Sequence, residues 1–179
     1  MLGPVLEGDR VRLEPPRAEN LETFVRWFAD PEVTRYLSRR HPPSLKQEQG
    51  WLESMAASGE DVAWAVYLKE SGALIGVTAL HRVDWRHRHA WIEISLGDRS
   101  AWGRGYATET VRLGTCYAFQ ELGLEKILAS TYNCNDASLR ILAKVGYRDC
   151  GLLRRNAFFA GQWHDEHLSE CLRDDWKGT

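Results

Sequence analysis

Apolar residues along the chain follow two different periods, and the changes of period divide the sequence into predicted helices and strands. Residues 18–29 place apolar side chains at helical spacing, which predicts a first helix. A short helix is predicted at 31–37 and a third at 44–57, capped by Ser44. Glu48 lies one position beyond the site that a capping box would use. Before these helices, residues 5–15 alternate apolar and charged side chains, which predicts a strand pair or a bent strand.

The middle of the chain is rich in β-branched and aromatic residues. The segments 62–68, 73–80 and 90–96 predict three successive strands, and Ser71-Gly72 marks a hairpin turn between the first two. Three strands in succession without intervening helices disfavour a regular doubly wound fold.

Helices and strands alternate again in the last part of the chain. After a glycine-containing loop, one apolar stripe predicts a helix that ends at Gly123, followed by a strand at 126–131. Asn135 is placed to cap another helix, which Gly146 stops. Two further strands are predicted around the Gly161 turn, at about 147–157 and 164–172. The order βααα-βββ-α-β-α-ββ indicates an α/β protein of the α+β type with a mixed sheet.

Composition narrows the class of protein. The 179 residues predict a single domain, 1–179, and a net charge of −2 argues against general nucleic-acid binding. No apolar run reaches the length of a membrane span, and the first residues carry no signal-peptide pattern, so we expect no membrane partner. Four widely spaced cysteines fit reduced thiols in the cytoplasm.

The stretch WGRGYATET, residues 102–110, places two glycines where a strand is predicted to become a helix. Bare backbone at a helix amino terminus is suited to phosphate. A Walker loop requires a lysine that is absent here, and Thr108 occupies the third glycine position of a dinucleotide-binding fingerprint. A plain glycine turn is the remaining alternative to a phosphate loop.

The same stretch resembles the pyrophosphate-binding motif of the GNAT N-acetyltransferases, with Trp102 in the first position, as in their ribosomal-protein (RimJ/RimL-like) branch. NDASLRILAKVGYRDC at 135–150 and GQWHDE at 161–166 also resemble that branch, so the similarity runs through the chain. The resemblance implies the GNAT fold, a mixed central sheet with splayed strands and flanking helices, with acetyl-CoA bound between the strands at 90–96 and 126–131. The cofactor-binding residues it implies are Ile94, Leu96, Trp102, Gly103, Arg104, Gly105, Tyr106, Ala107, Thr108 and Asn135.

Acyl transfer to an amine requires a base and a proton for the departing thiolate. Glu93 is the candidate base, on the strand face opposite Ile92 and Ile94, with a solvent-facing structural carboxylate as the alternative. Leu142 stands where many GNAT enzymes have a tyrosine acid. By resemblance, Ser138 supplies the proton instead, although it is equally suited to satisfying the helix's own backbone donors.

We therefore expect an acetyl-CoA-dependent N-acetyltransferase that acts by direct transfer, with the N-terminal α-amino group of a protein as acceptor. A small amine acceptor (a polyamine, an amino acid or an antibiotic) and a non-catalytic CoA-binding module are the alternatives. A homodimer is possible. The histidines lack a metal-ligand spacing, so no metal is expected, and Cys134 has no partnering histidine motif. The candidate acceptor-binding aromatics are Trp27, Tyr36, Trp51 and Trp85.

Overall fold

A computed structural model describes residues 1–37 and 41–178. Its strands are β1 (Leu6–Glu7), β2 (Val11–Glu14), β3 (Val62–Leu68), β4 (Leu74–Asp84), β5 (His89–Leu96), β6 (Lys126–Tyr132), β7 (Arg148–Phe159) and β8 (Gln162–Leu172). Its α-helices are α1 (Leu21–Phe28), α2 (Pro31–Thr34), α3 (Leu45–Ala57), α4 (Tyr106–Gln120) and α5 (Asp136–Val145). Short 3₁₀ turns are η1 (Ala18–Asn20), η2 (Arg99–Ala101) and η3 (Arg173–Asp175). The predicted order of elements is confirmed.

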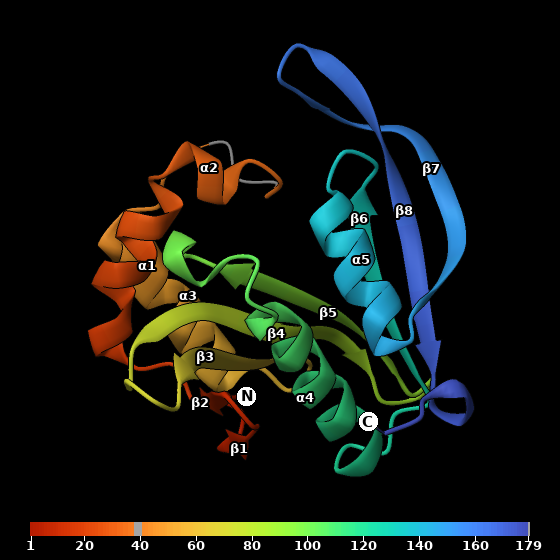
Figure 1. Cartoon of the computed structure of the whole chain (residues 1–179). Helices are drawn as coiled ribbons and strands as arrows, with labels where there is room; N and C mark the ends of the chain where they lie inside the picture. Colours follow the sequence, from red (N-terminus) through yellow and green to blue (C-terminus); the bar gives the residue numbers. More distant parts are fainter. Residues whose placement is uncertain (38–40, 179) are drawn as a thin grey trace.

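Within these residues, the strands form one 8-stranded sheet in the order β1-β2-β3-β4-β5-β6-β8-β7. The β5–β6 pair is parallel, and its register runs only from His89↔Lys126 to Trp91↔Leu128. Beyond these pairs the two strands separate, and β6, β8 and β7 leave the rest of the sheet (Figure 1). The expected mixed sheet with splayed strands is confirmed, and the separation exposes the β6-facing backbone of β5 from Ile92 onward.

The two faces of the sheet are covered by different helices. Alternate residues of β3 divide between two apolar clusters: Trp64 packs with Val111 and Ala118 of α4, whereas Ala65 packs with Phe24 of α1. This division follows from the two-residue period of a strand. Helix α4 approaches β5 closely, because a Cβ atom at Gly114 would lie 3.1 Å from Ile92 Cδ1.

Several boundaries differ from the sequence-based expectation. The predicted first helix divides into η1 and α1, and α2 ends at Thr34 rather than at residue 37. Ser44 caps α3 as predicted, and Gln47, at the capping-box position that Glu48 misses, completes the box. The Gln47 N–H donates to Ser44 Oγ at 3.3 Å, and the Ser44 N–H donates to Gln47 Oε1 at 2.8 Å. In the described ranges, no helix is long and apolar enough to cross a membrane.

Candidate active site

The glycine loop between β5 and α4 has a backbone shape that requires its glycines. Gly103 has φ +71° and Gly105 has φ +84°, and Gly105 is the N-cap of α4. Side chains rarely tolerate such positive φ values, so glycine at these two positions sets the path of the loop. Trp102 is fastened at the other end, since its Nε1–H donates to the Leu96 carbonyl at 2.8 Å. The loop therefore leaves the amino terminus of a 15-residue helix uncovered by side chains at residues 103 and 105.

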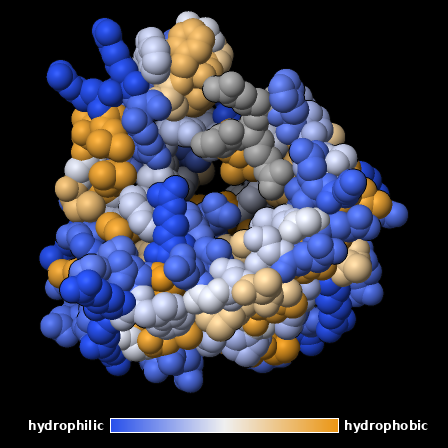
Figure 2. Space-filling view, turned by 180° about the vertical axis from the view of Figure 1, so that it is seen from behind, coloured by the Kyte–Doolittle hydropathy of each residue, from blue (hydrophilic) through white to orange (hydrophobic). Residues whose placement is uncertain are grey.

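A cavity of about 920 Å³ extends from this loop along the gap between β5 and β6. Its lining residues include the predicted cofactor-site residues Ile94, Leu96, Trp102, Gly103, Ala107 and Asn135. The molecule is visibly hollowed near its centre when seen from behind (Figure 2). The other predicted loop residues lie beside the cavity rather than in its lining: Arg104, Gly105, Tyr106 and Thr108.

Glu93 projects into this cavity from β5 and is more exposed than its central strand suggested. Its side chain is 71% exposed, and His81 Nε2 lies 3.9 Å from its Oε2 atom. Both side chains line the cavity. A carboxylate here is solvated because the splayed strands leave this part of β5 open, so it pays little of the desolvation cost expected of a covered strand.

Ser138 reaches the same cavity from α5. Asn135 caps that helix as expected, its Oδ1 accepting the Ser138 N–H at 3.2 Å. The backbone donor at 138 is thus satisfied by Asn135, and the Ser138 hydroxyl instead lies 3.1 Å from the Thr131 hydroxyl of β6. Leu142 also lines the cavity, at the position where many GNAT enzymes have a tyrosine.

Of the four candidate acceptor-binding aromatic residues, two line a cavity and two do not. Tyr36 lines the large cavity, and Trp51 lines a second cavity of about 320 Å³ beside α1 and α3. Glu93 lines both cavities, so it stands where they meet. Trp27 packs against Gly97 and Trp85 donates to the Gly59 carbonyl; within the described chain, neither is among the residues lining the two cavities.

Several polar cavity residues were not identified from the sequence, among them His81 and Glu166. His81 lies on β4 next to Glu93, and Glu166 lies on β8, where it accepts a hydrogen bond from Asn156. His81 directly follows the apolar strand segment 73–80, and a histidine at that point was a local signal for the first. The second had no such signal, because it depends on how β8 pairs with β6.

Outside the cavity, His87 and the cysteines have surroundings that account for the pKa shifts near them. His87 hydrogen-bonds Asp84 at 2.9 Å and lowers the pKa of that carboxyl to about 2. All four cysteines are unpaired, and burial raises the pKa of the Cys171 thiol to about 11. Among the described residues, no group of three or more histidine, cysteine or acidic side chains could hold a metal ion.

The walls of the cavity offer two kinds of backbone group that acetyl-CoA could use. Unpaired backbone of β5 is available to the amides of an extended pantetheine arm, and the bare loop at the start of α4 can donate N–H groups to phosphate oxygens. Both features open on the cavity that contains Glu93 and Ser138. The arrangement can bring an acyl thioester, a carboxylate and a hydroxyl together.

Comparisons with known proteins identify the family of this chain. Residues 10–148 match the acetyltransferase (GNAT) domain family. The chain is 29% identical over 173 residues to "Uncharacterized N-acetyltransferase YoaA" of Bacillus subtilis, covering 95% of this chain and 97% of that protein.

Two other proteins are more distant. The [ribosomal protein uS5]-alanine N-acetyltransferase of Escherichia coli is 24% identical over 174 residues, covering 96% of this chain and 87% of that protein. Spermidine N-acetyltransferase from Vibrio cholerae, solved with CoA and spermine, superimposes with a TM-score of 0.87 at 18% identity. That match covers 94% of this chain and 98% of that chain, and it shows the shared fold. The chain therefore belongs to the GNAT acetyltransferase family and is an acetyl-CoA-dependent N-acetyltransferase.

Proposed function

We propose that this protein, as a single domain of residues 1–179, acetylates the N-terminal α-amino group of a protein by direct transfer in a ternary complex. The observation that carries the proposal is the placement of Glu93 and Ser138 in one cavity that begins at the glycine loop. The N–H groups of residues 102–108 hold the pyrophosphate, with Arg104 adding charge. The backbone of β5 at Ile94 and Leu96 and the Asn135 side chain hold the pantetheine arm.

Two side chains of the protein then transfer one proton each. Acetyl-CoA supplies the activated acetyl group when it is bound. The Glu93 carboxylate accepts the proton that the acceptor amine releases, directly or through water. The Ser138 hydroxyl passes a proton to the departing sulfur and takes one back from water in the cavity, and its contact with Thr131 Oγ1 holds it beside that cavity.

The exposure of Glu93 supports an α-amino acceptor. The Glu93 carboxylate is 71% exposed, so water in the cavity reaches the place where the amine would lose its proton. An α-amino group, with a reference pKa of about 8, needs much less help than a lysine or polyamine amine at about 10.4. The acceptor's first side chain would extend from Glu93 into the second cavity, which Trp51 lines.

A small polyamine is the second candidate, because carboxylates from three elements line the large cavity: Glu32, Glu93 and Glu166. Separated carboxylates suit a chain that carries several ammonium groups. Arg35 and Arg82 line the same cavity, which reduces the net negative charge available to such a substrate.

A matched acceptor panel tests the proposal. One peptide has a free N-terminus and no lysine, and a second has an acetylated N-terminus and one lysine, with spermidine as the third acceptor. Thiol release from acetyl-CoA measures the rate, and mass spectrometry locates the acetyl group. We expect the first peptide to react fastest. A clear preference for spermidine or for the lysine peptide would contradict the α-amino proposal.

A further inference from the structure

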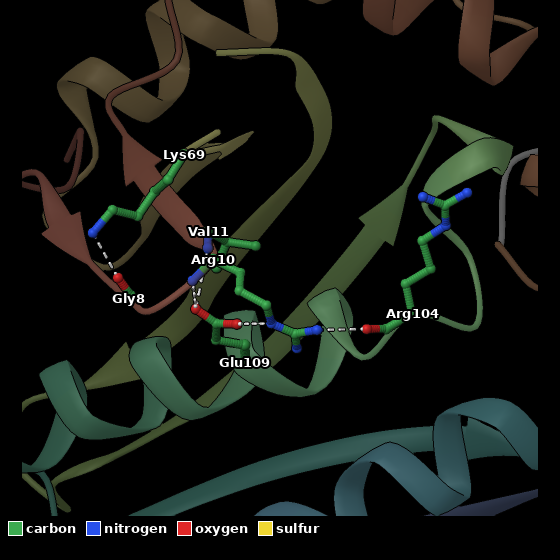
Figure 3. Close-up of polar contacts among 6 residues, drawn as sticks. All are labelled: Gly8, Arg10, Val11, Lys69, Arg104 and Glu109. Atoms are coloured by element: carbon green, nitrogen blue, oxygen red, sulfur yellow. Dashed lines mark hydrogen bonds and ion pairs between the residues drawn. The ribbon is translucent and has the colours of Figure 1, made fainter. Parts of the chain in front are cut away.

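Glu109, in the first turn of α4, is a buried carboxylate whose partners come from a distant part of the chain. The residue is 9% exposed, and its Oε1 atom accepts the backbone N–H of Arg10 at 2.7 Å and of Val11 at 3.1 Å. Its Oε2 atom accepts Arg10 Nε–H at 3.2 Å. These contacts join the β1–β2 turn to the beginning of α4 across about a hundred positions of sequence (Figure 3).

The β1–β2 turn is shaped to receive this carboxylate. A Cβ atom at Gly8 would lie 2.5 Å from Glu109 Oε1 and 2.9 Å from the Val11 carbonyl oxygen. Any side chain at residue 8 would therefore displace the carboxylate or open the turn. The close approach explains glycine at a position that the sequence pattern alone reads as an ordinary turn.

Arg10 extends the connection to the glycine loop. Its Nη1–H donates to the Arg104 carbonyl at 2.9 Å, and its guanidinium lies 5.0 Å from the centre of the Tyr106 ring. In a trans peptide the C=O and the following N–H point in opposite directions. Holding the Arg104 carbonyl toward Arg10 therefore directs the Gly105 N–H to the opposite side of the loop.

Arg10 also balances charge at this helix end. The amino terminus of α4 attracts phosphate through its free N–H groups, whereas the Glu109 carboxylate in the same turn would repel it. The Arg10 side chain is 54% exposed and pairs with that carboxylate, so its charge offsets the repulsion where the loop meets solvent.

We propose that Arg10 and Glu109 are positioning residues for the CoA phosphates. Glu109 holds Arg10 in place, and Arg10 fixes the direction of the Gly105 N–H through the Arg104 carbonyl. The Arg10 guanidinium also neutralises the Glu109 carboxylate beneath the loop. The proposal rests on the proposed function, in which this loop holds the pyrophosphate. It assigns a cofactor role to the β1–β2 turn, which lies outside the cavity lining.

The test measures CoA and pantetheine binding by calorimetry in wild type and in Arg10→Met, Arg10→Lys, Glu109→Gln and the Arg10→Met/Glu109→Gln double variant. Arg10→Met should weaken CoA binding about tenfold, the usual size for one charged hydrogen bond, and pantetheine binding much less. The double variant should bind CoA more tightly than Arg10→Met, because it no longer carries an uncompensated carboxylate. Arg10→Lys should keep wild-type thermal stability and still weaken CoA binding, because one ammonium cannot join Glu109 to the Arg104 carbonyl.

Lys69→Met is the matched control. Lys69 Nζ donates to the Gly8 carbonyl at 2.9 Å, so this variant disturbs the same turn without touching Glu109 or the loop (Figure 3). It should bind CoA as wild type does. Equal losses for CoA and pantetheine, or unchanged CoA affinity in folded Arg10→Met and Arg10→Lys, would overturn the positioning role. Wild-type protein that binds no CoA would overturn the proposed function itself, which is a separate result.

Discussion

The hydroxyl oxygens of Ser138 on α5 and Thr131 on β6 lie 3.1 Å apart. Thr131 is buried, and both residues line the large cavity. The Ser138 backbone N–H is already bonded to Asn135, so its hydroxyl is not needed to satisfy the first turn of the helix. The hydroxyl contact with Thr131 also ties α5 to β6, so a proton-donating role for Ser138 stays a prediction.

Replacing Ser138 with alanine should lower turnover about 10²-fold, the smaller end of the usual contribution of a general acid. Acetyl-CoA affinity should change little, because the proton is required only when the thiolate departs. Steady-state rates and calorimetry measure the two quantities. Thr131→Val is the control: it removes the orienting partner but keeps the Ser138 hydroxyl, so its loss should be smaller. Equal turnover in wild type and Ser138→Ala, with chemistry rate-limiting, would return Ser138 to a structural role.

Gly105→Val should weaken acetyl-CoA binding about tenfold or more, or roughly 1.4 kcal/mol. Residue 105 has φ +84°, and a Cβ atom there would lie 3.1 Å from Arg10 Nη2, so valine must distort the loop. Calorimetry on the folded variant gives the affinity. Gly50→Ala is a matched glycine control within α3, where a Cβ atom has open space, and it should leave affinity unchanged. If Gly105→Val binds acetyl-CoA with wild-type affinity, the phosphates do not bind at this loop.

The parts of the fold that the sequence predicted well depend on local signals. The strand period, the Asn135 cap and the positive φ of Gly105 each arise from a few neighbouring residues, and the structure places them as expected. The exposure of Glu93 was misjudged because it depends on β6 leaving β5 after the Trp91↔Leu128 pair. Backbone pairing between distant segments carries no periodic signal.

The Arg10–Glu109 pair shows the same limit at the site. Ninety-nine positions separate the two residues, and each alone reads as a surface charge. Only the β2–β3 pairing and the packing of α4 bring the β1–β2 turn beneath the glycine loop.

Tyr147→Phe should destabilise the fold by about 1–2 kcal/mol, the usual cost of leaving a buried hydrogen-bonding group without its partner. The Tyr147 and Thr115 hydroxyl oxygens lie 2.8 Å apart in the core, and burial raises the pKa of Tyr147, so its hydroxyl stays protonated. Urea unfolding measures the change. The Tyr147→Phe/Thr115→Val double variant should recover much of the loss, because neither polar group then remains. Additive losses in the double variant would show that packing, not the hydrogen bond, sets the cost.

Glu93→Gln should lower the rate at neutral pH about 10²-fold, because glutamine keeps the shape of the side chain and removes its basicity. The loss should shrink as the pH rises toward the pKa of the acceptor, about 8 for an α-amino group, since the neutral amine then forms without a base. Initial rates of both proteins on one peptide, from about pH 6 to about pH 9.5, measure this convergence.

His81→Gln tests whether the base is Glu93 or the neighbouring His81. The two are hard to tell apart by position, because His81 Nε2 lies 3.9 Å from Glu93 Oε2 and faces the same cavity. If Glu93 is the base, the His81 variant keeps most of the rate and a pH profile close to that of wild type, while Glu93→Gln loses rate mainly at low pH. If His81 accepts the proton, the two variants exchange these behaviours, because glutamine at 81 then removes the base. Parallel pH profiles and equal rates for wild type and both variants would show that neither side chain is the base. The amine would then lose its proton to water in the open cavity, as its modest pKa and the exposure of this wall permit.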